Sequence, residues 1–419
     1  TASRVTLESG TRISGNGTVG SLAAKAGALL APGNSIGTLS ITGDLRTEKG
    51  SLYDVELAAN GDGDRINVGG TAYLNGGHVT ARTLDPETSY INGQRYRIVD
   101  AKGGVQGAFD GVSTESAFLD MVVRQDASSV DLQIRVKRDA EFVDTAISEN
   151  QKSVASAADR MLQDGNSLAL YNKLLPLSAA QSRNAYDQLS GEVYAGLAAS
   201  IIDDNRSVRD AAGKHLSNRI DTDEATFWSS AYGSWGKSDA TDNYESAKRQ
   251  TKGLLLGGDV RHDNGWLFGA FGGYGTSDFD VKNRGSSASD SNYTVGAYAG
   301  YTGEAFGVQF GAANRWHNID VTRTVAFTDF FEGVRSDFNA NSFQVFGEVN
   351  GEASLGAASF EPYLNAAHVA FRSGSYQESG MSGLYGGSFS RGVTYTTLGS
   401  RMAYELSFGE TVAMLRGDI

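Results

Sequence analysis

The chain of 419 residues lacks cysteine altogether, has only four prolines, and contains no long apolar run. The absence of cysteine excludes a disulfide scaffold, a thiolate zinc site and a cysteine nucleophile. It would also help a protein that crosses an oxidising compartment unfolded, because stray disulfides would trap such a chain. Because a transmembrane helix needs about 18 or more consecutive apolar residues, the sequence predicts none.

Basic residues are also scarce. The chain has 36 Lys and Arg against 49 Asp and Glu, a net charge of −13, and this balance argues against a nucleic-acid partner, which needs a basic face. Thr1 begins in the middle of a pattern with no signal peptide before it, so we expect an internal fragment. The 53 glycines exceed the usual share of about 7%, but with so little proline they do not indicate a disordered Gly/Pro linker.

Residues 1–136 consist of short apolar, β-branched runs separated by groups of Gly, Asn and Asp. Leu39–Ile41 and Val55–Leu57 are such runs, and Asn60–Asp64 is such a group. The alternation predicts short strands joined by turns. Because the turns recur without a helical period, the pattern favours the stacked rungs of a β-solenoid, with a β-sandwich as the competing interpretation.

Residues 137–222 have a different period and predict a helical linker. Ser178 and Gln181 have the spacing of a capping box before a helix. Apolar residues then follow at three- and four-residue spacing, namely Tyr186, Leu189, Val193, Leu197 and Ile201. From Asp203 to Arg219 the pattern stays helix-compatible but is polar nearly all round, which is typical of a solvated helix or of one inside a polar channel.

Residues 223–419 hold most of the aromatic residues, including all four Trp, and alternate in longer segments. These runs of about 9–12 residues suit tilted strands that span a membrane, and aromatics recur near their ends. The sequence predicts short turns at Asp263–Asn264 and Gly303–Glu304 that alternate with long polar loops at 280–291 and 320–340. The pattern favours an outer-membrane β-barrel over a soluble β-domain. Roughly nine strands fit before the chain stops, and because a closed barrel needs an even number, we expect a truncated C-terminus.

Several motifs together resemble the bacterial autotransporters of type V secretion. Ala31–Leu39 reads A-P-G-N-S-I-G-T-L, similar to the signature near the end of a pertactin-like passenger, and Gly107–Asp110 resembles the cap that follows it. Leu189–Ala195, which reads L-S-G-E-V-Y-A, is similar to the segment before the linker helix of the family. Together these matches extend over nearly the whole chain.

The resemblance implies an all-β fold with an α-helical linker, truncated at both ends. Residues 1–136 would be a right-handed β-helix segment that helps the passenger fold, and residues 137–222 a linker with a helix in the barrel lumen. Residues 223–419 would be an up-and-down antiparallel barrel, which has twelve strands in the family and about nine here. The family closes with a terminal strand that ends in an aromatic residue, and this sequence lacks it.

The polar helix would then thread the lumen over residues 200–222. Its charged residues could pair with strand charges, here Asp259, Arg261, Glu348 and Glu361. The helix charges in question are Asp203, Asp204, Arg206, Arg209, Asp210, Lys214 and Arg219. A solvated linker is the alternative. We also expect the glycines inside strands to make room for this helix, namely Gly269, Gly272, Gly273, Gly296, Gly300 and Gly311.

Motifs that carry chemistry elsewhere do not predict a site here. Ser35 lies in a G-x-S-x-G run, but strand-like residues follow it rather than the helix that a nucleophile elbow needs. Lys237 and Ser238 resemble the tail of a P-loop without its glycine spacing or helix. Asp62 and Asp64 could offer oxygen ligands to calcium, although an ordinary Asn/Asp/Gly turn is the better interpretation.

The histidines do not lie at metal spacing from one another; they are His78, His215, His262, His317 and His368. His215 lies on the polar helix. No Asn–Asn pair occurs in 195–225, so the self-cleavage of the linker known in some family members is not expected. We therefore predict no catalytic, cofactor-binding or metal-binding residues, no cofactor, and no enzyme activity in this chain.

The sequence thus predicts an outer-membrane translocator and anchor that exports its own N-terminal passenger. Residues 1–136 would be exposed at the cell surface, where folding of the β-helix would bias transit outward. The alternative is the anchor fragment of a surface adhesin or exported enzyme whose active head is missing. The expected partners are outer-membrane lipid and, as the resemblance implies, the barrel-assembly machinery and periplasmic chaperones. We expect a monomer.

Overall fold

The structure is a computed structural model that describes residues 3–84, 93–162, 164–218, 225–303, 306–328, 330–351, 353–355, 358–408 and 411–418. The chain divides into two compact units, Thr1–Ser190 with Ala326–Glu332, and Gly191–Val325 with Gly333–Ile419. The division falls inside the predicted linker 137–222. The predicted domain limits at 136 and 222 stay predictions.

In its described part, the first unit is built from three sheets visited in turn. The first sheet has the order β1 (Arg4–Leu7), β4 (Ser21–Ala24), β7 (Leu45–Glu48), β10 (Ala72–Asn75), β13 (Val105–Ala108). The second has the order β14 (Gly111–Thr114), β11 (His78–Thr83), β8 (Leu52–Leu57), β5 (Leu29–Pro32), β2 (Arg12–Gly15). The third has the order β15 (Leu119–Gln125), β16 (Ser129–Val136), β12 (Arg95–Ala101), β9 (Arg65–Val68), β6 (Thr38–Ile41), β3 (Thr18–Val19).

Neighbours within each sheet are three strands apart in sequence and pair in parallel, as β6 does with β9. This is the topology of a β-helix, so the solenoid prediction is confirmed and the sandwich interpretation is wrong. Antiparallel pairing of β16 with β12 and β15 ends the stack. One apolar row runs through the interior of the rungs, including Leu39, Ile66 and Val99.

Glycines punctuate the turns of this stack, as predicted. Gly27 and Gly50 have φ of 77° and 84°, a left-handed conformation that glycine adopts without a steric penalty. They occupy equivalent corners of successive rungs, where the Gly27 N–H donates to the Gly50 carbonyl at 2.8 Å.

Short helices follow the solenoid: η1 (Phe142–Thr145), α1 (Glu149–Asp159), α2 (Gly165–Leu174) and α3 (Ala179–Leu189). The predicted capping box is confirmed, because the Gln181 N–H donates to Ser178 Oγ while the Ser178 N–H donates to the Gln181 side chain at 2.9 Å. The apolar series noted in the sequence is shared between two helices. Tyr186 and Leu189 lie on α3, and the later members lie on α4 (Glu192–Asn218). Among the described helices, none is both long enough and apolar enough to cross a membrane.

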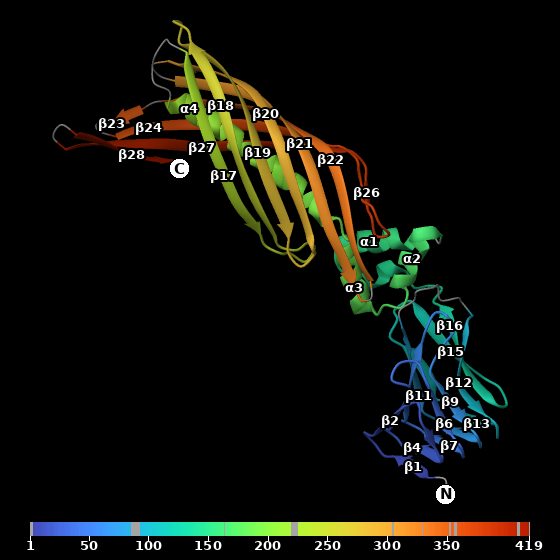
Figure 1. Ribbon diagram of the computed structural model, residues 1–419. Coiled ribbons are helices and arrows are strands. Elements are labelled where there is room, and N and C mark those ends of the chain that lie inside the picture. Colours follow the sequence, from blue (N-terminus) through green and yellow to red (C-terminus); the bar gives the residue numbers. More distant parts are fainter. Residues whose placement is uncertain are drawn as a thin grey trace. The chain divides into compact units, whose positions relative to one another are not determined.

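The second unit is an antiparallel sheet that curls around α4 (Figure 1). Its described strands run in the order β17 (Thr226–Ser238), β18 (Ala247–Arg261), β19 (Trp266–Val281), β20 (Ser286–Thr302), β21 (Phe306–Phe327), β22 (Phe330–Gly351), β24 (Ala358–Ser373), β27 (Phe389–Phe408), β28 (Thr411–Asp418). A short β23 (Ala353–Leu355) also pairs with β24, and β25 (Tyr376–Gln377) pairs with β26 (Tyr385–Gly386). The up-and-down order and the nine-strand path agree with the prediction.

The strand lengths and two of the loops were predicted wrongly. Strands β17 to β22 have 13, 15, 16, 17, 22 and 22 residues, not 9–12. The expected loop at 280–291 is only the turn between Val281 and Ser286, and the expected loop at 320–340 lies mostly inside β21 and β22. The turn at Asp263–Asn264 is confirmed by a hydrogen bond from the Gly265 N–H to the His262 carbonyl. Glu304 lies outside the described residues.

The error has a physical cause on β21. From Phe306 to Trp316 the apolar side chains lie at even positions on the outer face, where Phe306, Phe310 and Trp316 are exposed. Beyond His317 the apolar side chains move to odd positions and turn inward, as with Ile319 and Val321, while the even position Asp320 is exposed. The strand continues without a break, but its polar and apolar faces exchange sides.

The outer face shows where the apolar band lies. One row of aromatics contains Trp266 and Tyr301, with ring centroids 5.4 Å apart, and a second row contains Tyr274 and Tyr293, 5.2 Å apart. On β19 the two rows are eight residues apart (274 − 266), about 27 Å along the strand at about 3.4 Å per residue. Because barrel strands tilt by about 35–45°, this length corresponds to roughly 20 Å of height, close to the apolar band of about 25 Å that aromatic girdles flank in outer-membrane barrels.

The strand-interior glycines mostly serve a different neighbour from the one predicted. A Cβ atom on Gly269 would lie 2.3 Å from the Tyr298 ring, and one on Gly296 would lie 2.3 Å from the Phe271 ring. Each ring belongs to the directly opposed residue of the next strand. Of the six glycines named above, only Gly300 has a helix side chain as its nearest neighbour, Leu216 at 3.2 Å. The prediction that these glycines face the helix is therefore wrong for the other five.

Candidate functional site, a helix inside the sheet

The space inside the curled sheet is filled by α4, which contacts β17, β18, β19, β20 and β24. Near the start of the helix this interior is apolar. Val193, Leu197 and Ile201 pack against strand residues that include Phe279, Ile319, Val321, Val369 and Phe371. Gly196 allows the closest approach, because a Cβ atom there would lie 2.6 Å from the Phe279 ring.

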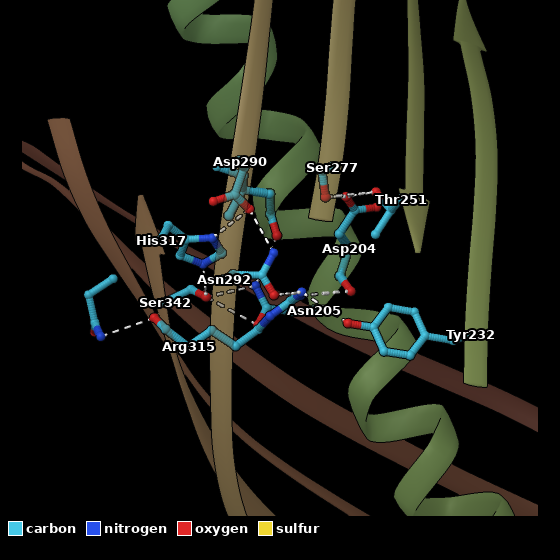
Figure 2. A network of polar contacts seen from close by, with 12 residues as sticks. Asp204, Asn205, Tyr232, Thr251, Ser277, Asp290, Asn292, Arg315, His317 and Ser342 are labelled. Atoms are coloured by element: carbon cyan, nitrogen blue, oxygen red, sulfur yellow. Dashed lines mark hydrogen bonds and ion pairs between the residues drawn. The ribbon is translucent and has the colours of Figure 1, made fainter. Parts of the chain in front are cut away.

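The middle of the helix lies in a buried polar network (Figure 2). Arg315 on β21, only 1% exposed, donates to the Asn292 side chain at 2.7 Å and to the Asp204 carbonyl at 3.3 Å. The Asp204 carboxylate accepts from the Thr251 hydroxyl. Because a buried polar group without a partner costs free energy, this network fixes which helix residues face which strands.

Asn205 anchors the helix backbone and side chain to β22. Its side chain exchanges hydrogen bonds with Ser342 Oγ at 3.1 and 3.2 Å, and its carbonyl accepts from Gln344 Nε2 at 3.1 Å. Asn205 and Ser342 are both fully buried. Specific hydrogen bonds, rather than apolar packing alone, therefore hold this part of the helix against the strands.

Asp290, His317 and Ser342 have the contacts of a serine–histidine–aspartate relay. His317 Nδ1 lies 2.9 Å from Asp290 Oδ2, and His317 Nε2 lies 2.9 Å from Ser342 Oγ. A catalytic serine must also face a substrate carbonyl and its oxyanion donors. Here the Ser342 hydroxyl is occupied by the Asn205 carboxamide inside a packed interior, so the relay ties β20, β21 and β22 to the helix.

Ion pairs between helix and strands exist, but with partners other than those predicted. Asp203 and Asp204 pair with Arg249 on β18, the second at 3.7 Å. Arg206 pairs with Asp210 on the helix itself, at 3.2 Å. The predicted strand acids Glu348 and Glu361 instead hold Arg401 of β27, at 2.8 and 2.7 Å.

The end of the helix is held by His215, whose Nε2 contacts the buried Asp259 carboxylate. Tyr298 also donates to Asp259, at 2.8 Å, and Trp228 Nε1 donates to Tyr298 at 2.7 Å. Asp259 is thus a predicted strand partner that does contact the helix, although through His215 rather than through one of the charges listed above. Arg209 stacks on the Tyr395 ring at 5.0 Å, and Arg219 lies outside the described residues.

Beside this half of the helix the interior is open and polar. A cavity of about 830 Å³ is lined by Arg206, Arg209 and Lys214 from the helix and by Glu348, Glu361 and Arg401 from the strands. A second cavity of about 280 Å³ includes Arg261. Such charged walls suit water, whereas the apolar packing around Val193 and Leu197 excludes it.

The enzyme-like motifs of the sequence occupy ordinary structural positions. Ser35 lies in the turn between β5 and β6, and the residues that follow it form a strand, as predicted. Lys237 and Ser238 end strand β17. Among the described residues, no group of three or more His, Asp or Glu could hold a metal ion.

Asp64 joins neighbouring rungs of the solenoid. Its two oxygens accept from the backbone N–H groups of Gly37 at 2.8 Å and Glu56 at 2.9 Å. Burial raises the pKa of Asp64 to about 6, although the two N–H donors act in the opposite direction. The Asp64 side chain therefore has a structural role in the solenoid. Asp62 lies in the adjoining turn, where it pairs with Asn60.

Residues 227–419 match the family model of the autotransporter β-domain. This part of the chain is an autotransporter β-domain. Two extracellular serine proteases of Serratia marcescens are 28% and 26% identical over 100% of this chain, which covers 45% of each of them. The chain thus spans a little under half the length of the curated relatives it matches.

Two solved structures also resemble the chain. The translocator domain of the autotransporter NalP from Neisseria meningitidis has a TM-score of 0.42 at 14% identity, covering 53% of this chain and 77% of that one. The β-domain of the Bordetella autotransporter BrkA has a TM-score of 0.37 at 18% identity, covering 46% and 76%.

Membership of the family gives the site its setting. Autotransporter β-domains are outer-membrane barrels of type V secretion and are not themselves catalytic. The functional feature of this β-domain is therefore its lumen and the helix that fills it. Sequence reasoning located the helix but missed Arg249, Arg315, His317 and Ser342 as its partners. The available signal was their position on the inward-facing side of alternating strands.

Proposed function

We propose that this chain is the translocator and membrane-proximal part of an autotransporter, which exports its own N-terminal passenger through or alongside the barrel. The observation that supports this most is the seating of α4. A chain segment from the end that leads to the solenoid enters the curled sheet and is bound there by buried polar contacts, including Asn205 with Ser342. A sheet with an apolar outer band and a chain in its interior suits transport of that chain.

In this proposal residues 1–136 lie at the cell surface and promote folding of the β-helix. Their rungs stack by backbone pairing, as between Ile41 and Val68, so each formed rung templates the next one. Folding outside the cell would bias transit outward without ATP or an ion gradient. Outer-membrane lipid would be the surrounding partner, with the barrel-assembly machinery and periplasmic chaperones acting before insertion and the barrel working as a monomer.

The test is protease access in intact cells that express the full-length protein. A tag in the exposed turn at Asn60 should be cleaved by added protease, whereas a tag in the turn at Asp263 should be protected until the outer membrane is opened. Equal protection of both tags would contradict surface exposure. Migration in detergent gels should also shift on heating, and a full-length protein without this shift would not contain a barrel.

A second possibility is that the chain anchors an exported enzyme or an adhesin. The names of the Serratia relatives, extracellular serine proteases, favour an enzyme, and this chain covers 45% of them. The sequence that precedes residue 1 in the full-length protein decides between them. A catalytic triad there would indicate an enzyme, and a longer array of rungs without one would indicate an adhesin.

A further inference from the structure

The loop of residues 374–388, between β24 and β27, folds over the beginning of α4. Within this loop Tyr376 pairs with Gly386 in the β25–β26 hairpin. The Tyr376 ring stacks on the ring of Tyr194 from the helix, with centroids 3.8 Å apart and planes 8° apart. Leu384 packs against Gly191, where a Cβ atom would lie 2.9 Å from the Leu384 side chain.

The loop places the carboxylate of Glu378 in a buried position where both of its oxygens accept hydrogen bonds. Arg323 of β21 donates to it through Nε at 2.7 Å and through its terminal nitrogen at 2.8 Å, and both side chains are 1% exposed. The Tyr194 hydroxyl donates to the same carboxylate at 2.7 Å, and the Leu384 N–H donates at 2.9 Å. Ser336 Oγ lies 2.7 Å from the Tyr194 hydroxyl.

One of these partners comes from the helix, which couples the two elements. A buried ion pair is tolerated only when its remaining hydrogen-bonding capacity is satisfied. Without the beginning of α4 in place, Glu378 loses a donor and Tyr376 loses its stacking partner. The position of the loop therefore depends on whether the helix is docked.

At this level the interior has no room for another chain. Tyr194 and Phe338 line a residual space of only about 10 Å³ together with Tyr376, which is about the volume needed to hold one water molecule. Farther along the helix, beside Arg206, Arg209 and Lys214, the cavity measures about 830 Å³. The loop and the helix thus close one end of the lumen while the rest stays open.

We propose that residues 374–388 form a latch that closes over α4 once the segment before Glu192 has left the lumen. The latch rests on the proposed export function and adds a step to it. While a passenger segment occupies the mouth, the loop is displaced and Glu378 is solvated. When the helix arrives, Tyr194 completes the pocket around Glu378, the loop closes, and the mouth is sealed against return of the chain and leakage of solutes.

Hydrogen exchange of the full-length protein in detergent tests the coupling. Glu378→Gln removes the charge at constant size, and Tyr194→Phe removes only the hydroxyl. Each should speed exchange of amides 376–386 by about tenfold or more, because each removes a hydrogen bond to a buried charge. The double variant should exchange little faster than Glu378→Gln alone, since Tyr194 acts through its hydrogen bond to that carboxylate. Gln377→Ala, an exposed neighbour, should leave exchange unchanged.

Two outcomes would overturn the latch. If Tyr194→Phe left exchange of the loop at the level of Gln377→Ala, the sheet alone would hold the loop. If the two substitutions acted additively, the helix and the loop would close independently. Because Tyr194→Phe keeps the ring and its stacking, it decides the question even if Glu378→Gln fails to fold.

A cell-based measurement separates the latch from the proposed function. With the latch weakened, protease access to a tag in residues 1–136 should match wild type, because the loop closes after transit. Entry of a bulky antibiotic should rise severalfold. Unchanged entry in both variants would overturn the seal, whereas failure of the wild-type protein to display the tag would overturn export itself and leave the exchange result standing.

Discussion

Among the described residues, Arg315 and Arg323 are the largest fully buried side chains, and both point into the lumen. Burying such a charge costs free energy unless hydrogen bonds compensate for the lost water. The Arg315 guanidinium donates to three neutral oxygens, those of the Asn292 side chain, the Tyr232 hydroxyl and the Asp204 carbonyl, while its buried Nε has no hydrogen-bond partner among the described residues. Its role is therefore to hold the helix at one depth in the sheet.

Replacement of Arg315 by Leu should destabilise the β-domain by about 2–3 kcal/mol, because at least two buried acceptors lose their donor. Lys252→Leu, an exposed change on β18, is the matched control and should be nearly neutral. The urea concentration at half unfolding in detergent measures both. Equal midpoints for the two variants would show that Arg315 makes no net contribution.

Asp64 predicts a pH dependence in the solenoid. Its pKa is raised from 3.8 to about 6 in the folded state, so the folded protein binds this proton more tightly than the unfolded chain. The contribution to stability is thus greatest below pH 4 and is lost as the pH rises through 6. At about 1.4 kcal/mol per pKa unit, the loss is about 3 kcal/mol at most.

The measurement is the free energy of opening of the Ile66 amide from hydrogen exchange at pH 4.5 and pH 7.5, corrected for intrinsic rates. Wild type should be more protected at the lower pH, and Asp64→Asn should remove most of the difference, because Asn does not titrate. A wild-type protein that is equally protected at both pH values would contradict the assignment to Asp64.

At the scale of elements, α4 shows which features could be predicted from the sequence and which could not. Its polar pattern predicted a helix in a polar channel, and the channel exists. The specific partners could not be predicted, because residues such as Arg249 and Ser342 join the helix only after the strands acquire a register and a curvature. Asp259 does face the helix, as expected of an inward-facing acid, but its partner is His215, which was not among the helix charges expected to pair.

We expect the amides of residues 205–218 to exchange slowly, because the sheet surrounds this stretch and Asn205 is fully buried. Opening there requires the helix to leave the lumen rather than to fray locally. Helix α1, with Lys152 exposed on its surface, is the internal comparison and should exchange faster. Rapid exchange over 205–218 would instead indicate a solvated linker.

The predicted strands were too short because the apolar residues of one strand change from one face to the other along its length. A search for one alternating pattern stops where the parity of the apolar residues changes, as it does after Trp316 on β21. On one side of that point the strand faces apolar surroundings outside and polar groups inside. On the other side it resembles a strand of a water-soluble protein and packs its apolar side chains on the start of α4. Hydrogen bonding to β20 continues across both parts.

The limits of the apolar band predict that the free-energy cost of an outward-facing charge depends on its position along the strand. Phe310 and Asn318 both point outward on β21, but only Phe310 lies between the two aromatic rows. Phe310 lies just inside the row of Trp266, with ring centroids 6.2 Å apart, so Phe310→Lys should cost about 1–2 kcal/mol, whereas Asn318→Lys should be almost neutral. Phe310→Leu controls for the lost ring. Reversible folding into lipid vesicles gives the three values, and equal costs for both lysines would contradict the assigned band.

At the scale of the whole molecule, the absence of cysteine and the stacked topology both bear on the proposed passage of residues 1–136 across the outer membrane. Each rung pairs with the next across a long loop, so Thr38 and Arg65, which are 27 residues apart (65 − 38), lie directly opposite each other in a parallel pair. Neighbouring strands lie about 4.8 Å apart, within the range of about 4.4–6.8 Å between the Cα atoms of a disulfide. A cysteine pair at these positions would close a loop that a narrow passage cannot accept.

Thr38→Cys with Arg65→Cys in the full-length protein should therefore reduce surface display of residues 1–136 strongly when the periplasm is oxidising. Reductant in the growth medium should restore it, because the loop then opens and the segment can pass as an extended chain. Each single variant should be displayed as wild type, which separates the crosslink from the substitutions themselves. If the oxidised double variant reached the surface as efficiently as the single ones, the segment would cross the outer membrane already looped or folded, and the lack of cysteine would have no bearing on export.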